Sequence, residues 1–154
     1  MKTGEKLIWG VGGLMLVFGI IGALTHREET KAIPFYEEKS PAFEAGRAVF
    51  DQENCRGCHT LWSLGNMPGP SLDGLGEVRS AAWLETYLSA KNPQEIVPSH
   101  FQRQFKMPSY RHLSNDDMDH LIAFLTGLRV HPDFKNEFFQ MWRSDHPETQ
   151  PENQ

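Results

Sequence analysis

Two closely spaced cysteines constrain this chain more than any other feature of its sequence. They are Cys55 and Cys58, the chain has no others, and His59 follows directly. A disulfide-based fold needs several bridges across long loops, and a structural zinc site needs four ligands, usually as two close pairs. No histidine pair follows Cys58 at zinc-finger spacing, and the strand–helix context of a redox dithiol is missing. The two thiols therefore serve one local purpose.

The sequence from 55 to 59, CRGCH, has the spacing by which c-type haem is attached. Two thiols this close can add to the two vinyl groups of one porphyrin, and the next residue then presents its imidazole to the iron. Covalent attachment also retains the group in a domain too small to enclose it. We therefore predict one covalently attached haem c on Cys55 and Cys58, with His59 as an axial ligand of the iron.

The second axial ligand is expected downstream, and Met107 is the preferred candidate. Single-haem electron carriers usually close the iron with a methionine sulfur or a second histidine. Met107 lies in an irregular stretch directly before Pro108, where a loop can approach the opposite face of the ring. His100 and His112 remain as alternatives. Met67 is disfavoured because it lies only a short way along the chain from His59. Met118 and His120 are disfavoured because both lie on a predicted helix.

Helical periodicity dominates the sequence after position 40. We predict helices over 42–50, over 80–90 with Ser80 as its N-cap, and onward from Ser114, whose first turns carry three aspartates. The expected apolar faces are Trp83, Leu84, Tyr87 and Leu88 in the second of these helices, and Met118, Leu121, Ile122, Leu125 and Leu128 in the third. No segment alternates with period two, so no sheet is expected. The predicted fold class of the domain is all-α.

An uncharged apolar stretch, 7–24, lies near the start of the chain, with Lys2 and Lys6 before it. As a helix it would extend roughly 27 Å at about 1.5 Å per residue, close to a hydrocarbon core of about 30 Å. We predict a single N-terminal transmembrane anchor over 1–24 and a linker over 25–40. A cleaved secretory signal is the alternative, although the stretch is longer than usual and has no clean cleavage site.

The attached haem and the predicted anchor together indicate where the protein is located. Covalent haem is added on the outer side of the bacterial inner membrane, so we expect a single-pass protein of that membrane with its haem domain on the periplasmic side. The formal net charge of −5 and the scattered basic residues argue against nucleic acid as a partner.

The last predicted segment, 130–154, is rich in aromatic residues. Four of them would cluster on one side of a short helix: Phe134, Phe138, Phe139 and Trp142. This helix either packs on its own domain or docks against a partner subunit, since aromatic residues are enriched in interface cores. Residues 147–154 are all polar or proline and are predicted to be disordered.

The predicted domain, 41–129, resembles class I cytochromes c from Pro41 to about Leu128. The resemblance rests on Gly46 and Phe50 before the motif, CRGCH itself, the GPSL loop, Met107-Pro108 and the LSNDDMDHLIAFL helix. It implies a cytochrome c domain that transfers electrons and is not an enzyme. It also implies that the carbonyl of Pro70 accepts a hydrogen bond from the imidazole of His59.

A narrower resemblance is to the cytochrome c subunit of respiratory nitric oxide reductase. It rests on Leu24-Thr25-His26, where the apolar stretch ends, and on Cys58-His59-Thr60-Leu61, whereas the loop from 62 to 76 departs from that subunit's pattern. In that complex the subunit takes electrons from a soluble periplasmic donor and passes them to a multi-span, haem-containing membrane subunit. The alternative is a free-standing, membrane-anchored shuttle to another terminal oxidase or reductase.

A haem enzyme is the hypothesis from another class. It would need an open position on the iron for substrate, and a Met107 ligand closes that position. Arg103, Lys106 and Tyr110 are candidates for contacts to the haem propionates, with a solvated-surface role as the alternative for each. Trp62 and Trp83 are expected to pack either on the porphyrin edge or in the core.

Overall fold

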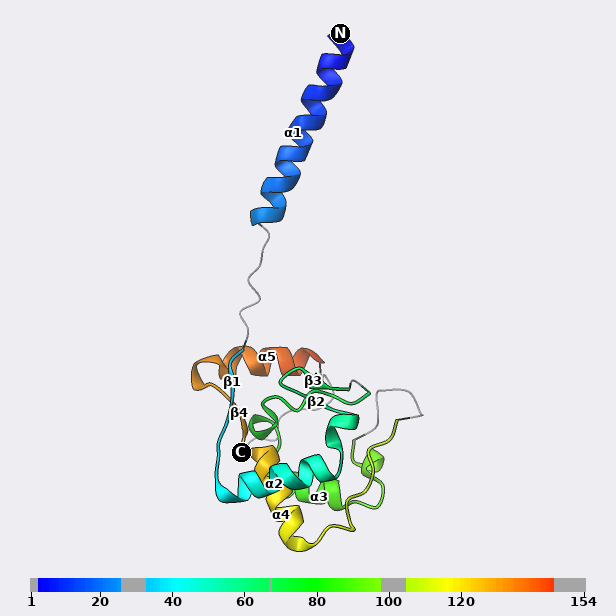
Figure 1. Ribbon diagram of the computed structural model, residues 1–154, viewed down its shortest axis with the longest axis vertical. Coiled ribbons are helices and arrows are strands. Elements are labelled where there is room, and N and C mark those ends of the chain that lie inside the picture. The colour runs from blue at the N-terminus through cyan, green and yellow to red at the C-terminus, as the bar shows by residue number, and fades with distance from the viewer. Residues whose placement is uncertain (1–2, 26–32, 67, 98–104, 146–154) are drawn as a thin grey trace. The chain divides into compact units, whose positions relative to one another are not determined.

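The computed structural model describes residues 3–25, 33–66, 68–97 and 105–145 of the chain (Figure 1). It divides into two units, Met1–Ala32 and Ile33–Gln154, which are described separately. The predicted disordered tail, 147–154, lies outside the described residues.

The first unit contains one helix, α1 (Thr3–Thr25), within the residues described. Across the described parts of the chain, no helix is both long and apolar enough to cross a membrane. The predicted transmembrane anchor over 1–24 and the single-pass inner-membrane location, with its periplasmic side, are therefore corrected.

Three helices of the second unit begin at a serine N-cap: α2 (Pro41–Gln52) at Ser40, α3 (Ala81–Ser89) at Ser80 and α4 (Asn115–Thr126) at Ser114. Each serine hydroxyl accepts a hydrogen bond from the backbone N–H three residues ahead, at 3.0, 3.2 and 3.1 Å respectively. These bonds satisfy N–H groups that have no partner inside the helix. The three helices predicted from periodicity, with the caps at Ser80 and Ser114, are confirmed.

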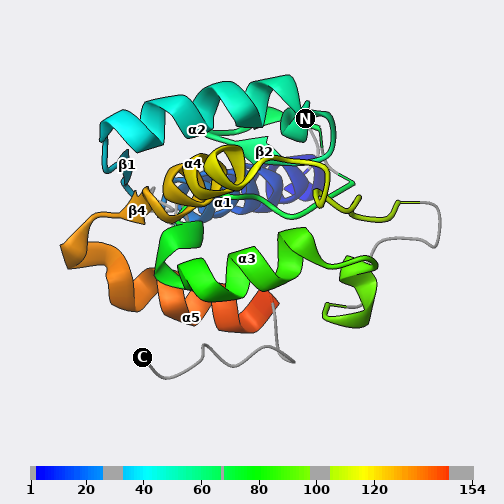
Figure 2. The ribbon, with the colours of Figure 1, turned by 90° about the horizontal axis from the view of Figure 1, so that it is seen from below.

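The main core lies where α2 and α4 pack side by side (Figure 2). Phe124 of α4 sits between Phe43 and Phe50 of α2, at ring-centroid distances of 4.8 and 4.9 Å. The helices approach so closely because Gly46 has no side chain: a Cβ there would collide with the backbone carbonyl of His120. Met118, Leu121, Ile122 and Leu125 of the predicted apolar face are buried in α4, as is Phe124, which was not predicted for that face. Leu128, predicted on the same helix, is buried too but belongs to the strand Leu128–Val130.

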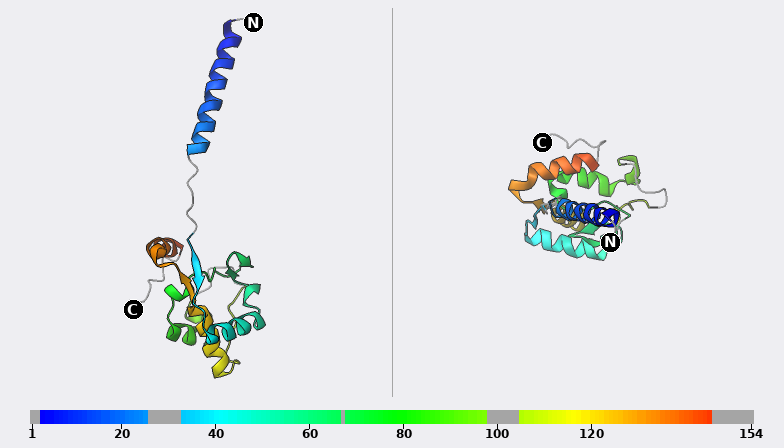
Figure 3. Two further views of the ribbon diagram at one scale, coloured as in Figure 1. Left: turned by 60° about the vertical axis from the view of Figure 1, so that its left-hand side comes forward. Right: turned by 90° about the horizontal axis from the view of Figure 1, so that it is seen from above.

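Two small antiparallel sheets join segments of the second unit, so the expectation of no sheet is wrong. Strand β1 (Phe35–Glu37), inside the range assigned to the linker, pairs with β4 (Leu128–Val130), as the left view of Figure 3 shows. Strands β2 (Thr60–Leu61) and β3 (Leu64–Gly65) form a hairpin. Strands of two or three residues are too short to show a period of two. Short 3-10 helices complete the unit: η1 (Cys55–Gly57), η2 (Leu75–Glu77), η3 (Pro93–Glu95) and η4 (Pro132–Phe134).

The aromatic segment near the end of the chain forms α5 (Lys135–Asp145) and packs on its own domain. Phe138 is 2% exposed and forms a second core cluster with Val78 and Val130. Lys135 pairs with the buried carboxylate of Glu77 at 2.8 Å, which fixes the start of the helix. Of the two alternatives for this segment, packing on its own domain is the one observed.

We expect Gly46→Ala to destabilise the haem-loaded protein by about 3 kcal/mol, because the added methyl group forces α2 away from α4. Helix propensity alone would favour the alanine. The control is Ala48→Gly on the exposed side of α2, which should cost only about 1 kcal/mol. Denaturant unfolding followed by circular dichroism measures both. A Gly46→Ala protein as stable as the native one would show that the helix contact is not tight.

Candidate haem-attachment site

The CRGCH motif begins just after α2 and is folded into a single tight turn. Asn54 takes a left-handed conformation, with φ of 53°, and turns the chain out of the helix. The backbone N–H groups of Cys58 and His59 both donate to the carbonyl of Cys55, at 3.1 and 2.9 Å. These bonds fix the backbone that carries the two thiols and the imidazole, which are the groups that attachment of a single porphyrin requires.

The imidazole of His59 is oriented by the loop that follows the hairpin. Its Nδ1 lies 2.8 Å from the carbonyl oxygen of Pro70, and the backbone N–H of Gly69 donates to the carbonyl of Cys58 at 2.7 Å. A carbonyl only accepts, so the proton of a neutral ring is on Nδ1 and Nε2 has a free lone pair. This is the bond that the cytochrome c resemblance implied, and it is confirmed.

Two features keep the His59 ring in the form that binds a metal. Burial lowers its pKa, against the opposing effect of the Pro70 hydrogen bond, so the ring is neutral at neutral pH. Gly69 lets the loop lie against the ring, because a Cβ at this position would be 2.8 Å from both Nδ1 and Cε1. A neutral imidazole with a fixed tautomer is the usual state of a histidine that ligates iron.

The two thiols differ in their surroundings. Cys55 is buried and Cys58 is exposed. Burial raises the pKa of Cys55 to about 11, although a hydrogen bond with the Tyr110 side chain acts in the opposite direction. Tyr110 is itself 5% exposed, so this contact lies inside the domain. Tyr110 therefore does not have the solvated-surface role weighed for it; it lies in the core next to the motif.

The donor set and its surroundings fit a haem c. Two thiols and a neutral, oriented imidazole are the groups that covalent attachment and proximal ligation need. Partly buried apolar side chains that pack on the core also remain available to cover a flat ring: Trp62, Leu75, Trp83, Tyr87, Met107 and Leu113. When bound, the haem supplies a one-electron couple between ferric and ferrous iron.

Met107 is partly buried, and its carbonyl accepts a hydrogen bond from the Gln94 side chain at 2.8 Å. Two competing ligands are engaged elsewhere: Met118 lies in the core, and His112 contacts the Glu53 carboxylate at 3.2 Å. His100 and Met67, which were also weighed, lie outside the described residues. Met107 therefore stays the predicted second axial ligand.

A residue that sequence reasoning missed, Glu37 of β1, anchors the turn after the motif. Its carboxylate accepts from Arg47 at 2.6 Å and from the Trp62 indole at 3.2 Å. Burial by itself raises the pKa of Glu37, but the hydrogen bonds from Arg47 and Trp62, together with the positive charges of Arg47 and Lys39, outweigh it and lower the pKa below its usual value. Trp62 has a φ of 54°, and its backbone N–H donates to Asp73 at 2.8 Å. Glu37 could have been located only from the pairing of β1 with β4. That pairing joins segments far apart in the sequence, so no local pattern indicates it.

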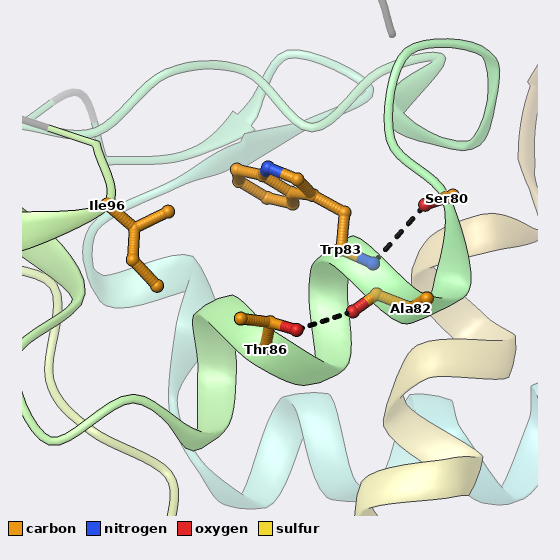
Figure 4. A pocket seen from close by; sticks show the side chains of 5 residues that line it. All are labelled: Ser80, Ala82, Trp83, Thr86 and Ile96. Atoms are coloured by element: carbon orange, nitrogen blue, oxygen red, sulfur yellow. Dashed lines mark hydrogen bonds between the residues drawn. The ribbon is translucent and has the colours of Figure 1, made fainter.

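An open depression of about 310 Å³ lies beside α3. Figure 4 shows the side chains of Trp83 and Ile96 among those that line it. The polar groups at its edge are used inside the helix: Ser80 accepts from the Trp83 backbone, and Thr86 donates to the carbonyl of Ala82 at 2.9 Å. The hydroxyls of Ser80 and Thr86 are thus engaged within α3, and we do not assign the depression as a second site.

This geometry defines a c-type haem-binding domain, and comparison with known proteins names its family. Residues 43–129, more than half of the chain, match the cytochrome c family, so the chain belongs to that family. Membership implies a haem and a role in electron transfer. An 88-residue stretch is 34% identical to cytochrome c oxidase subunit 2 of Alkalihalophilus pseudofirmus, covering 55% of this chain and 25% of that relative. The chain thus spans about a quarter of the relative's length.

We expect the full chain, expressed with a haem-maturation system, to retain haem on a denaturing gel and to give a c-type pyridine haemochrome spectrum. The double variant Cys55→Ser, Cys58→Ser should lose covalent haem, because serine hydroxyls do not add to vinyl groups. Thr60→Ser is the control, since it introduces a serine beside the motif but keeps both thiols. Haem that stays covalently bound in the double variant would contradict the assignment.

Proposed function

We propose that this chain is a single-haem electron carrier that delivers electrons to a haem–copper respiratory complex. The imidazole of His59 and the thioether of Met107 would hold its iron, and the haem would supply the one-electron couple. The observation that carries the proposal is the 2.8 Å contact of His59 Nδ1 with the Pro70 carbonyl, which leaves Nε2 free for iron in the residue that directly follows the two thiols of the motif. These residues bind and orient; none has to move or exchange a proton for an electron to pass.

A closed iron with two protein ligands supports electron transfer over catalysis. A methionine ligand leaves no position for substrate and favours a relatively high reduction potential. The surroundings of the motif are also closely packed. At Gly46, α2 lies directly against α4, and at Gly69 the loop lies directly against the His59 ring. A rigid site keeps the iron's surroundings similar in both oxidation states, which suits rapid one-electron exchange.

The proposed acceptor is a haem–copper complex, and the nitric oxide reductase type is the narrower proposal. The CHTL continuation of the motif supports the reductase type. The similarity to a relative named cytochrome c oxidase subunit 2 supports the wider class. The donor is proposed to be a soluble electron carrier.

Met107→Ala should abolish the weak near-infrared absorption band that arises from sulfur bound to ferric haem iron, and should lower the reduction potential. Met141→Ala is the matched control, since Met141 is exposed on α5 and 45% of its surface is accessible. Optical spectroscopy and redox titration of the haem-loaded protein measure both effects. A band that persists in Met107→Ala would show that another residue ligates the iron.

The acceptor is tested by purifying the full chain, tagged at its C-terminus, from its native host at native expression. We expect a haem-containing catalytic subunit of the haem–copper class to co-purify and to oxidise the ferrous chain within the complex. Peptide mass spectrometry identifies the subunit and distinguishes a nitric oxide reductase from an oxidase. Recovery of the chain alone, with no oxidation by either enzyme, would overturn the proposed acceptor.

A further inference from the structure

The segment that carries Met107 has little regular structure of its own. Residues 105–109 belong to no helix or strand, and Pro108 has no N–H to contribute to a hydrogen bond. Methionine also has three rotatable side-chain bonds, so its sulfur is poorly placed unless its backbone is fixed. The position of the Met107 backbone must therefore be set by contacts from elsewhere in the domain.

Gln94 provides such a contact. Its side-chain amide, Nε2, donates to the carbonyl oxygen of Met107 at 2.8 Å, across thirteen positions of sequence. That carbonyl lies one bond from the Cα that carries the thioether, so fixing the oxygen limits where the sulfur can go. Gln94 is partly buried, which protects the bond from competing water.

Gln94 belongs to η3, a turn that is held in place by core packing and by its own hydrogen bonds. Pro93, the first residue of η3, is fully buried, and its carbonyl accepts from the N–H groups of Ile96 and Val97 at 3.0 Å each. The side chains of Asn92 and Glu95 pair across the same turn at 2.9 Å. The donor that reaches Met107 therefore starts from a turn that is anchored in the core and closed on itself.

The other side of the Met107 segment is held as well. The backbone N–H of Tyr110 donates to the carbonyl of Leu88 at the end of α3, at 2.9 Å, and Tyr110 is buried against Cys55. The segment is thus fixed on one side by Tyr110 and at Met107 itself by Gln94. Of these two anchors, only Gln94 bonds to the residue proposed to bind iron.

We propose that Gln94 is a positioning residue that holds Met107 at the sixth coordination position of the haem iron. The inference rests on the proposed function, since it requires Met107 to be an iron ligand. Gln94 acts through the Met107 backbone and does not touch the iron. Its contribution is to reduce the conformational freedom that the methionine loses on ligation.

Competition between Met107 and added imidazole tests this role in the full, haem-loaded chain. Imidazole displaces the thioether from ferric iron, and loss of the near-infrared band reports the displacement. Gln94→Leu removes the donor, so its apparent affinity for imidazole should rise between about twofold and tenfold, the range expected for one hydrogen bond. Gln94→Glu keeps the length but has no proton to donate when ionised, so it should shift the affinity in the same direction and serves if the leucine variant fails to mature.

Rescue and control variants separate positioning from general stability. Gln94→Lys restores a donor and should bring the affinity back toward that of the native protein. Gln140→Leu makes the same substitution at an exposed position of α5 and should change nothing. Unchanged imidazole affinity in both Gln94→Leu and Gln94→Glu would overturn the inference while leaving Met107 as ligand. A native protein that lacks the near-infrared band would instead overturn the ligand assignment, and the inference with it.

Discussion

The close contact between α2 and α4 is the constraint on which the rest of the domain depends. Gly46 lets the backbone of His120 come close enough for Phe124 to fill the space between the two phenylalanines of α2. This contact sets the direction of α2 and therefore the point where the chain leaves it at Asn54. Since the haem motif starts at the next residue, the position of both thiols follows from a packing contact outside the site.

The site itself is assembled from segments that are far apart in the sequence. The motif turn supplies the thiols and the imidazole, and the loop at Pro70 fixes the tautomer of that imidazole. Gln94 of η3 then donates a hydrogen bond to the backbone carbonyl of Met107. Each contact uses a backbone carbonyl as acceptor, so the arrangement depends on the path of the chain more than on further charged side chains. A site fixed in this way suits a carrier that passes electrons without rearranging.

Local signals predicted the helices well and the short strands poorly. Ser80 and Ser114 were identifiable as caps because a cap acts within three residues. The Pro70 contact followed from the cytochrome c resemblance. The strands were missed because β1 and β4 are three residues each and are defined by one another across most of the domain. The expectation of a membrane anchor came from an apolar run alone, and no helix in the described part of the chain is both long and apolar enough to cross a membrane.

By itself, the sequence determined the cofactor chemistry and the helical framework. Two thiols, an adjacent histidine and serine caps act over a few residues, so their meaning can be read without knowing the fold. Only the tertiary structure decided which ring nitrogen of His59 is free, that Glu37 holds Trp62, and that Gln94 reaches Met107. These contacts join residues that are distant in sequence. A hydrogen bond requires its donor–acceptor distance to be right to within a few tenths of an ångström, and distances between residues remote in sequence are set this closely only once the chain has packed.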